Sequence, residues 1–148
     1  MKFHELGDNH NPHIVLIHGG GNSWWNYLRQ ARLLSDKYHV ILPVLDGHGE
    51  EYQKEYVSTE RSAQELLEYI RKHCNGHVFA LGGVSLGGQI VMELLSLDSH
   101  IADKAIIDGS LCIPQPKLAK MSLFFVKCFG KLIFGKAACK MQLKLMRK

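Results

Sequence analysis

Several features that would set a protein apart from ordinary globular chains are missing from this sequence. Its cysteines, Cys74, Cys112, Cys128 and Cys139, form no CxxC pair, so we expect free thiols in a reducing compartment. The first residues contain no apolar signal region, which predicts a cytoplasmic protein. No run of about 18 uninterrupted apolar residues occurs, so no membrane-spanning helix is expected. A length of 148 residues with 46% hydrophobic and 22% charged positions instead indicates one globular domain with a sizeable core.

Acidic residues are missing from the last part of the chain. All 14 lie at or before Asp108, together with 9 of the 18 lysines and arginines. The part up to Asp108 therefore carries a net charge of −5, and the part after it carries +9. The overall charge of +4 is a property of the tail and not of the whole surface, so a nucleic-acid partner is not expected.

Short apolar runs alternate with helical patterns along the chain. Strands are expected at residues 13–18, 38–45, 77–84 and 104–108, and helices at residues 24–37, 58–74 and 86–97. This alternation predicts an α/β protein, with a parallel sheet and helices on both of its faces. Pro114 and Pro116 mark a break in composition, which divides the chain into a core at 1–113 and a basic amphipathic helical segment at 114–148.

A serine lies among glycines where the third expected strand meets the third expected helix. The stretch reads GVSLGG, with Ser85 two residues after Gly83 and two before Gly87. Side chains at either glycine would collide with a tight turn, and Gly88 would let the helix pack close to the sheet. Such a turn holds the serine hydroxyl clear of the backbone and beside the positive end of a helix. The alternative is that Ser85 merely occupies a tight turn.

A second glycine-rich stretch, HGGG at residues 18–21, follows the first expected strand. The backbone N–H groups of Gly20 and Leu86 could form a two-donor oxyanion hole, flanked by Gly19 and Gly21. The alternatives are a phosphate-binding turn and a purely structural one. Trp24 occupies the place of the last glycine of GxGxxG, and no lysine follows Gly87, so neither stretch matches a phosphate motif.

With both stretches in place, the sequence resembles the α/β-hydrolase superfamily. HGGG resembles the family's oxyanion turn, DGHG at 46–49 the loop after its fourth strand, and GVSLGG its nucleophile elbow; IIDGS at 106–110 resembles the end of its sixth strand. The resemblance implies the N-terminal portion of this fold, cut after the sixth strand. It also implies a serine hydrolase in which Ser85 attacks an ester, thioester or related acyl bond of a small-molecule substrate, without a cofactor.

The partners of such a serine are hard to find. The family order is Ser, then Asp or Glu, then His, whereas the nine histidines of this sequence end at His100. Asp108 is the candidate acid, and the alternative is a solvent-facing or loop-capping Asp. Structural roles are expected for His18 and His48. Without a late histidine, the alternative function is a catalytically impaired fragment or a noncatalytic binding module.

Two other sets of residues have the spacing of possible sites. The pairs His10/His13 and His73/His77 have loose metal-like spacings but no evident third ligand, so no metal is expected.

The tail carries Lys136, Lys140, Lys144 and Lys148 at helical spacing. We interpret it as a cap over an acyl pocket. A peripheral contact with an anionic membrane is the alternative, and the sequence predicts no oligomeric state.

Overall fold

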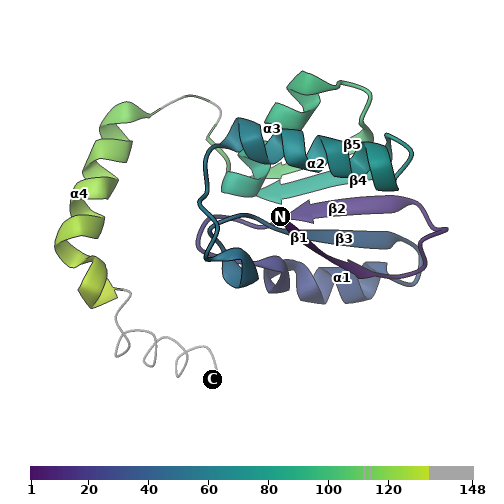
Figure 1. The fold of residues 1–148 in the computed structure, drawn as a ribbon, viewed down its shortest axis with the longest axis horizontal. Coiled ribbons are helices and arrows are strands. Elements are labelled where there is room, and N and C mark those ends of the chain that lie inside the picture. Colours follow the sequence, from purple (N-terminus) through teal and green to yellow (C-terminus); the bar gives the residue numbers. More distant parts are fainter. Residues whose placement is uncertain (112, 114, 134–148) are drawn as a thin grey trace. The chain divides into compact units, whose positions relative to one another are not determined.

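The computed structural model describes residues 1–111, 113 and 115–133. The chain divides into two compact units, Met1–Cys112 and Ile113–Lys148 (Figure 1). The predicted row of lysines from Lys136 to Lys148 lies outside the described residues.

The first unit is built on a five-stranded sheet with the strand order β1-β3-β2-β4-β5. The strands are β1 (Lys2–Leu6), β2 (His13–Ile17), β3 (His39–Val44), β4 (Val78–Val84) and β5 (Ala102–Asp108). The last four are parallel, as predicted, and β1 pairs with β3 in the antiparallel direction. Strand β1 was not predicted, because its sequence KFHEL is short, half polar and only partly buried at the sheet edge.

Helices and 3-10 turns connect the strands. They are η1 (Trp24–Tyr27), α1 (Leu28–Leu34), η2 (Gly49–Glu51), α2 (Thr59–His73) and α3 (Leu86–Leu97). The helix expected at 24–37 was too long at both ends. Its first turn is a 3-10 turn, and it stops at Leu34, whose carbonyl accepts hydrogen bonds from the N–H groups of Lys37 and Tyr38. These two hydrogen bonds close a tight turn after α1, and the chain then enters β3.

Helices cover both faces of the sheet, which confirms the prediction. Val15 and Ile17 of β2 belong to a buried cluster with residues of α2 and α3, whereas Ile14 and Leu16 pack with Ala31 of α1. Successive strand residues point to opposite faces, so α1 and the pair α2/α3 lie on opposite sides (Figure 1). The side of α2 and α3 holds the larger cluster.

The second unit contains helix α4 (Pro116–Ile133), of 18 residues, which agrees with the predicted helical segment. Among the described residues, no helix is long and apolar enough to cross a membrane.

Candidate active site

Ser85 occupies a sharp turn between β4 and α3. It is the first residue beyond β4 and the N-cap of α3, and its φ of 52° with ψ of −113° is unusual for a residue other than glycine. Hydrogen bonds at its backbone hold this conformation: its N–H donates to Asp108 O at 2.8 Å, and its carbonyl accepts from Ser110 Oγ at 2.8 Å. The Ser85 residue is exposed. The turn therefore presents the hydroxyl to solvent at the helix N-terminus.

The glycines around Ser85 are required by close packing. A methyl group on Gly83 would collide with the backbone of Gly87, and one on Gly87 would collide with the carbonyl of Ile17 at the end of β2. A methyl group on Gly88 would collide with the Ser110 hydroxyl. The turn is thus confined between β2 on one side and the residues that follow β5 on the other.

The fold brings the HGGG turn beside this serine. Ile17 pairs with Gly83 in the parallel register of β2 and β4, so the residues that follow each strand lie at the same edge of the sheet. A methyl group on Gly19 would lie 3.6 Å from Cβ of Ser85, and one on Gly20 would lie 3.8 Å from the Leu86 side chain. Gly21 has a φ of 75°, which favours glycine, and the Asn22 N–H closes the turn on Gly19 O at 3.2 Å. Residues about 65 positions apart in the sequence therefore share one site.

His18 supports the HGGG turn through hydrogen bonds. Its ring is fully buried, and the Leu45 N–H donates to Nε2 at 3.2 Å. Because Nε2 accepts, the proton lies on Nδ1, which donates to Gly19 O at 2.8 Å. Burial lowers the pKa of His18, and the neighbouring His48 lowers it further, while the bond to Gly19 opposes both. Both ring nitrogens of this neutral imidazole are therefore occupied by the backbone.

His48 lies in the DGHG loop after β3. Its Nδ1 is 2.9 Å from Asp46 O, and its ring lies 5.3 Å from the ring of His18. Its ring also lies 5.9 Å from the ring of Tyr56. These contacts link the loop after β3 to the end of β2.

Asp108 reaches the site through its backbone. It pairs with Val84 at the ends of β5 and β4, and its carbonyl accepts the Ser85 N–H. The Asp108 residue itself is exposed. Burial raises the pKa of Tyr27, and the negative charge of Asp108 raises it further.

Ser110 is a further residue that the sequence pattern did not single out. Its hydroxyl lies 2.8 Å from Ser85 O and 3.2 Å from Asp108 O, and it occupies the space that Gly88 leaves open. The small residue after Gly109 in the IIDGS stretch is the signal that could have indicated this packing.

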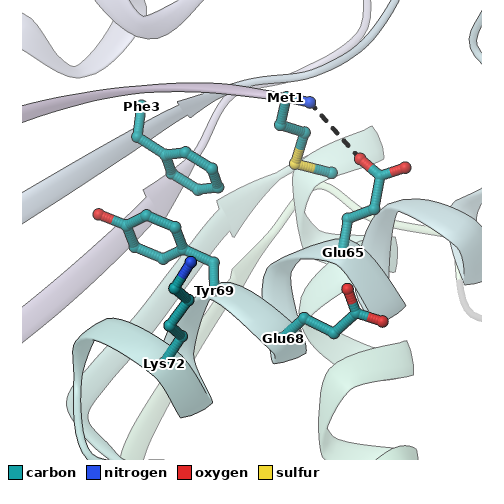
Figure 2. A pocket seen from close by; sticks show the side chains of 6 residues that line it. All are labelled: Met1, Phe3, Glu65, Glu68, Tyr69 and Lys72. Atoms are coloured by element: carbon teal, nitrogen blue, oxygen red, sulfur yellow. Dashed lines mark hydrogen bonds and ion pairs between the residues drawn. The ribbon is translucent and has the colours of Figure 1, made fainter.

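Two hollows of the first unit lie away from Ser85. One, of about 270 Å³, is lined by Met1, Phe3, Glu65, Glu68, Tyr69 and Lys72, with the Phe3 and Tyr69 rings stacked (Figure 2). The other, of about 380 Å³, runs along the α1 side of β4 and β5 and is mostly apolar, with Phe79 and Ile106 among its lining residues. Neither is lined by Ser85 or by the HGGG turn.

The described residues contain no group of three or more histidine, cysteine, aspartate or glutamate side chains that could hold a metal ion. The His73/His77 pair is separated by the end of α2, and Nε2 of His77 lies 3.3 Å from a carboxylate oxygen of Asp103.

Comparisons with known proteins agree with this geometry. A family model described as the alpha/beta hydrolase fold matches residues 12–130. An esterase/lipase of Haemophilus influenzae is 28% identical over 124 residues, which cover 83% of this chain and 43% of that protein. A pimeloyl-acyl-carrier-protein methyl ester esterase of Vibrio cholerae is 29% identical over 106 residues, covering 72% of this chain and 38% of that enzyme.

Among solved structures, an alpha/beta hydrolase family protein from Desulfitobacterium hafniense superposes with a TM-score of 0.79 at 28% identity, covering 91% of this chain and 55% of that one. This chain thus spans less than half the length of the two curated relatives. The strand order, the serine turn and the family match lead to one conclusion: the chain belongs to the alpha/beta hydrolase fold family.

Proposed function

We propose that this chain carries the nucleophile and oxyanion half of a serine hydrolase that acts on an ester, thioester or related acyl bond of a small molecule. The observation that carries the proposal is the meeting of two turns: Ser85 at a φ of 52°, and Gly19 close enough for its added methyl to lie 3.6 Å from Ser85 Cβ. Strained residues of this kind persist where the surrounding structure over-determines them, and they cluster at functional sites.

In the proposed reaction, Ser85 Oγ attacks the acyl carbon, and its proton passes through solvent water to the departing alcohol or thiol. The tetrahedral intermediate between these steps carries negative charge on the former carbonyl oxygen. The N–H groups of Gly20 and Leu86 are the proposed donors to that oxygen. The first N–H groups of a helix have no partner within the helix, which leaves Leu86 free of a helical bond. The alcohol or thiol then leaves, and water releases the acyl group from Ser85.

Among the described residues of the proposed site, no acceptor for the proton of Ser85 is evident. His18 cannot accept it, because its two ring nitrogens are engaged by Gly19 and Leu45. Asp108 is the proposed acid, since its strand ends beside Ser85, but an acid acts through a histidine in such triads. We therefore expect turnover by residues 1–148 alone to be far below that of a complete triad, at about 10³–10⁴ over the reaction in water.

A noncatalytic binding module on the same scaffold is the second candidate function. The full engagement of the His18 ring favours it, because Gly19 and Leu45 occupy both nitrogens of the histidine that supports the HGGG turn.

A fluorophosphonate probe with a fluorescent tag separates the two candidates. A nucleophilic Ser85 is expected to be labelled in the purified chain, and Ser85→Ala is expected to abolish the labelling. Ser96→Ala is the matched control, because Ser96 lies on α3 near its other end and bonds only to the carbonyl of Glu93 in the observed contacts. Absence of labelling in the folded wild-type chain, or equal labelling of Ser85→Ala, would support the binding module.

A further inference from the structure

Helix α4 has a sharply divided surface that the proposed reaction does not use. At about 100° per residue, Lys117, Lys120 and Lys127 fall within an arc of about 80°. The apolar residues of the same helix fill an arc of about 200° on the remaining surface. They are Leu118, Ala119, Met121, Leu123, Phe125, Val126 and Phe129, and within this arc Ser122 and Gly130 are the exceptions among residues 116–130. Phe124 lies within the lysine arc.

The apolar side chains of α4 are exposed. Each of Leu118, Met121, Leu123, Phe125, Val126 and Phe129 is at least 43% exposed. The rings of Phe125 and Phe129 stack at 6.0 Å, so the apolar arc includes one exposed aromatic pair. A helix that packs on one protein surface commonly buries a stripe of about 100°. If α4 packed on one protein surface in this way, much of its apolar arc of about 200° would therefore remain in water.

The positive charge of the segment that contains α4 indicates what kind of partner its apolar arc would bind. Its basic residues meet no acidic residue of their own segment, because the last acidic residue of the sequence is Asp108. Lysines beside a wide apolar arc are typical of helices that lie in the plane of a membrane interface, with the lysine stems reaching up to the headgroups. We propose that α4 binds the surface of a bilayer containing anionic phospholipids, lying parallel to it. This contrasts with the cap interpretation, which predicts no salt-sensitive binding to lipid.

Co-sedimentation of the purified chain with vesicles tests this proposal. Binding to vesicles of phosphatidylcholine with about 30% phosphatidylserine is expected at low salt, and loss of binding at about 0.5 M NaCl, where screening shortens the reach of charges to a few ångströms. Vesicles of phosphatidylcholine alone are expected to bind far less. Failure of the wild-type chain to sediment with the anionic vesicles at low salt would overturn the proposal in favour of a cap.

Matched charge reversals locate the binding surface. Lys120→Glu with Lys127→Glu is expected to lower the partition coefficient at least about 30-fold, since each lysine near an anionic surface contributes about 5-fold. Lys37→Glu with Lys72→Glu makes the same change of charge at exposed positions of the first unit and is expected to have little effect. Equal losses in the two double variants would contradict a role for α4.

A second measurement does not depend on charge. Phe125→Trp is expected to give added tryptophan emission that brominated phospholipids quench, because Phe125 lies within the apolar arc. Leu33→Trp, at an exposed site of α1, is the control and is expected to escape quenching. Ser85→Ala should bind vesicles like the wild type, so failure of the hydrolase proposal and failure of the lipid proposal are separable. An unquenched Phe125→Trp in sedimented protein would overturn the proposal.

Discussion

Strands β4 and β5 are neighbours of equal length that differ sharply in burial. Each has seven residues, and they pair in parallel from Val78 with Ala102 to Val84 with Asp108. All but the first residue of β5 are exposed, whereas every residue of β4 is buried or half-buried. Strand β4 lies between β2 and β5, while the described part of the chain places β5 at the sheet edge. The serine of the proposed site is thus built on the core, and its proposed acid on an edge.

This difference explains how the strained turn at Ser85 persists. The residues before it are fixed in the sheet, and Gly87 beyond it is pressed against the carbonyl of Ile17. Strain of about 1–3 kcal/mol is tolerated when neighbouring packing leaves no alternative. On the other side, Asp108 holds its place through the Ser85 N–H and the Ser110 hydroxyl. The position of Asp108 therefore depends on the serine turn as well as on the pairing of its strand with β4.

The largest expected effect comes from truncating one apolar residue on each strand. Leu81→Ala, on β4, removes a fully buried side chain and is expected to lower the free energy of unfolding by about 2–5 kcal/mol. Ile106→Ala, on β5, removes a side chain that is 64% exposed and is expected to change it by less than about 0.5 kcal/mol. Urea denaturation of both variants measures the difference. Similar losses would show that β5 is covered in solution.

A second pair of variants compares the turns that follow the two strands. Gly87→Ala places a methyl group against the Ile17 carbonyl and is expected to lower the free energy of unfolding by about 1–3 kcal/mol or more. Gly109 follows β5 in open space with a φ of 56°, so Gly109→Ala should cost only the backbone preference, about 1 kcal/mol. Thermal unfolding followed by circular dichroism ranks the two. A larger loss for Gly109→Ala would mean that the β5 side is the more tightly packed.

The smallest expected effect concerns the buried histidine at the end of β2. Because burial lowers the pKa of His18 below its ordinary value of 6.5, the unfolded chain binds a proton there more readily than the folded chain. The stabilisation is therefore present above about pH 6.5 and is lost as the pH falls below it. The free energy of unfolding should decrease more steeply from about pH 7.5 to about pH 5 in the wild type than in His18→Gln.

The control for this pH dependence is His10→Gln, since His10 is 90% exposed. It should keep the slope of the wild type, as measured by denaturant titration at each pH. Identical slopes for the wild type and His18→Gln would mean that the HGGG turn accommodates a protonated ring.

Much of the fold could be predicted from local pattern. The four parallel strands and the helices α2 and α3 follow from apolar runs separated by turn residues, and the side-chain oxygen of Ser58 caps α2 by accepting the Arg61 N–H at 3.1 Å. Strand β1 escaped prediction because its stability comes from pairing with β3 rather than from its own composition. The end of the first helix was wrong for a similar reason: the turn into β3 overrides local helix preference.

Part of the candidate site could likewise be predicted from local pattern, and part could not. The glycines around Ser85 and the HGGG stretch are enough to indicate a nucleophile turn and a neighbouring donor turn from the sequence, and their catalytic roles stay a proposal. Ser110 could not be predicted, because it reaches the serine turn only through the pairing of β4 with β5.

The sequence by itself determined the order of most strands and helices, the glycines of the two turns, and the net positive charge of the tail, because these depend on local sterics and composition. Tertiary structure decided which residues meet. The parallel register of β2 with β4 brings Gly19 to Ser85, the Leu45 N–H that follows β3 fixes the tautomer of His18, and the edge position of β5 leaves Asp108 exposed. Each of these depends on contacts between residues far apart in the chain, whose spacing only the packed sheet can set.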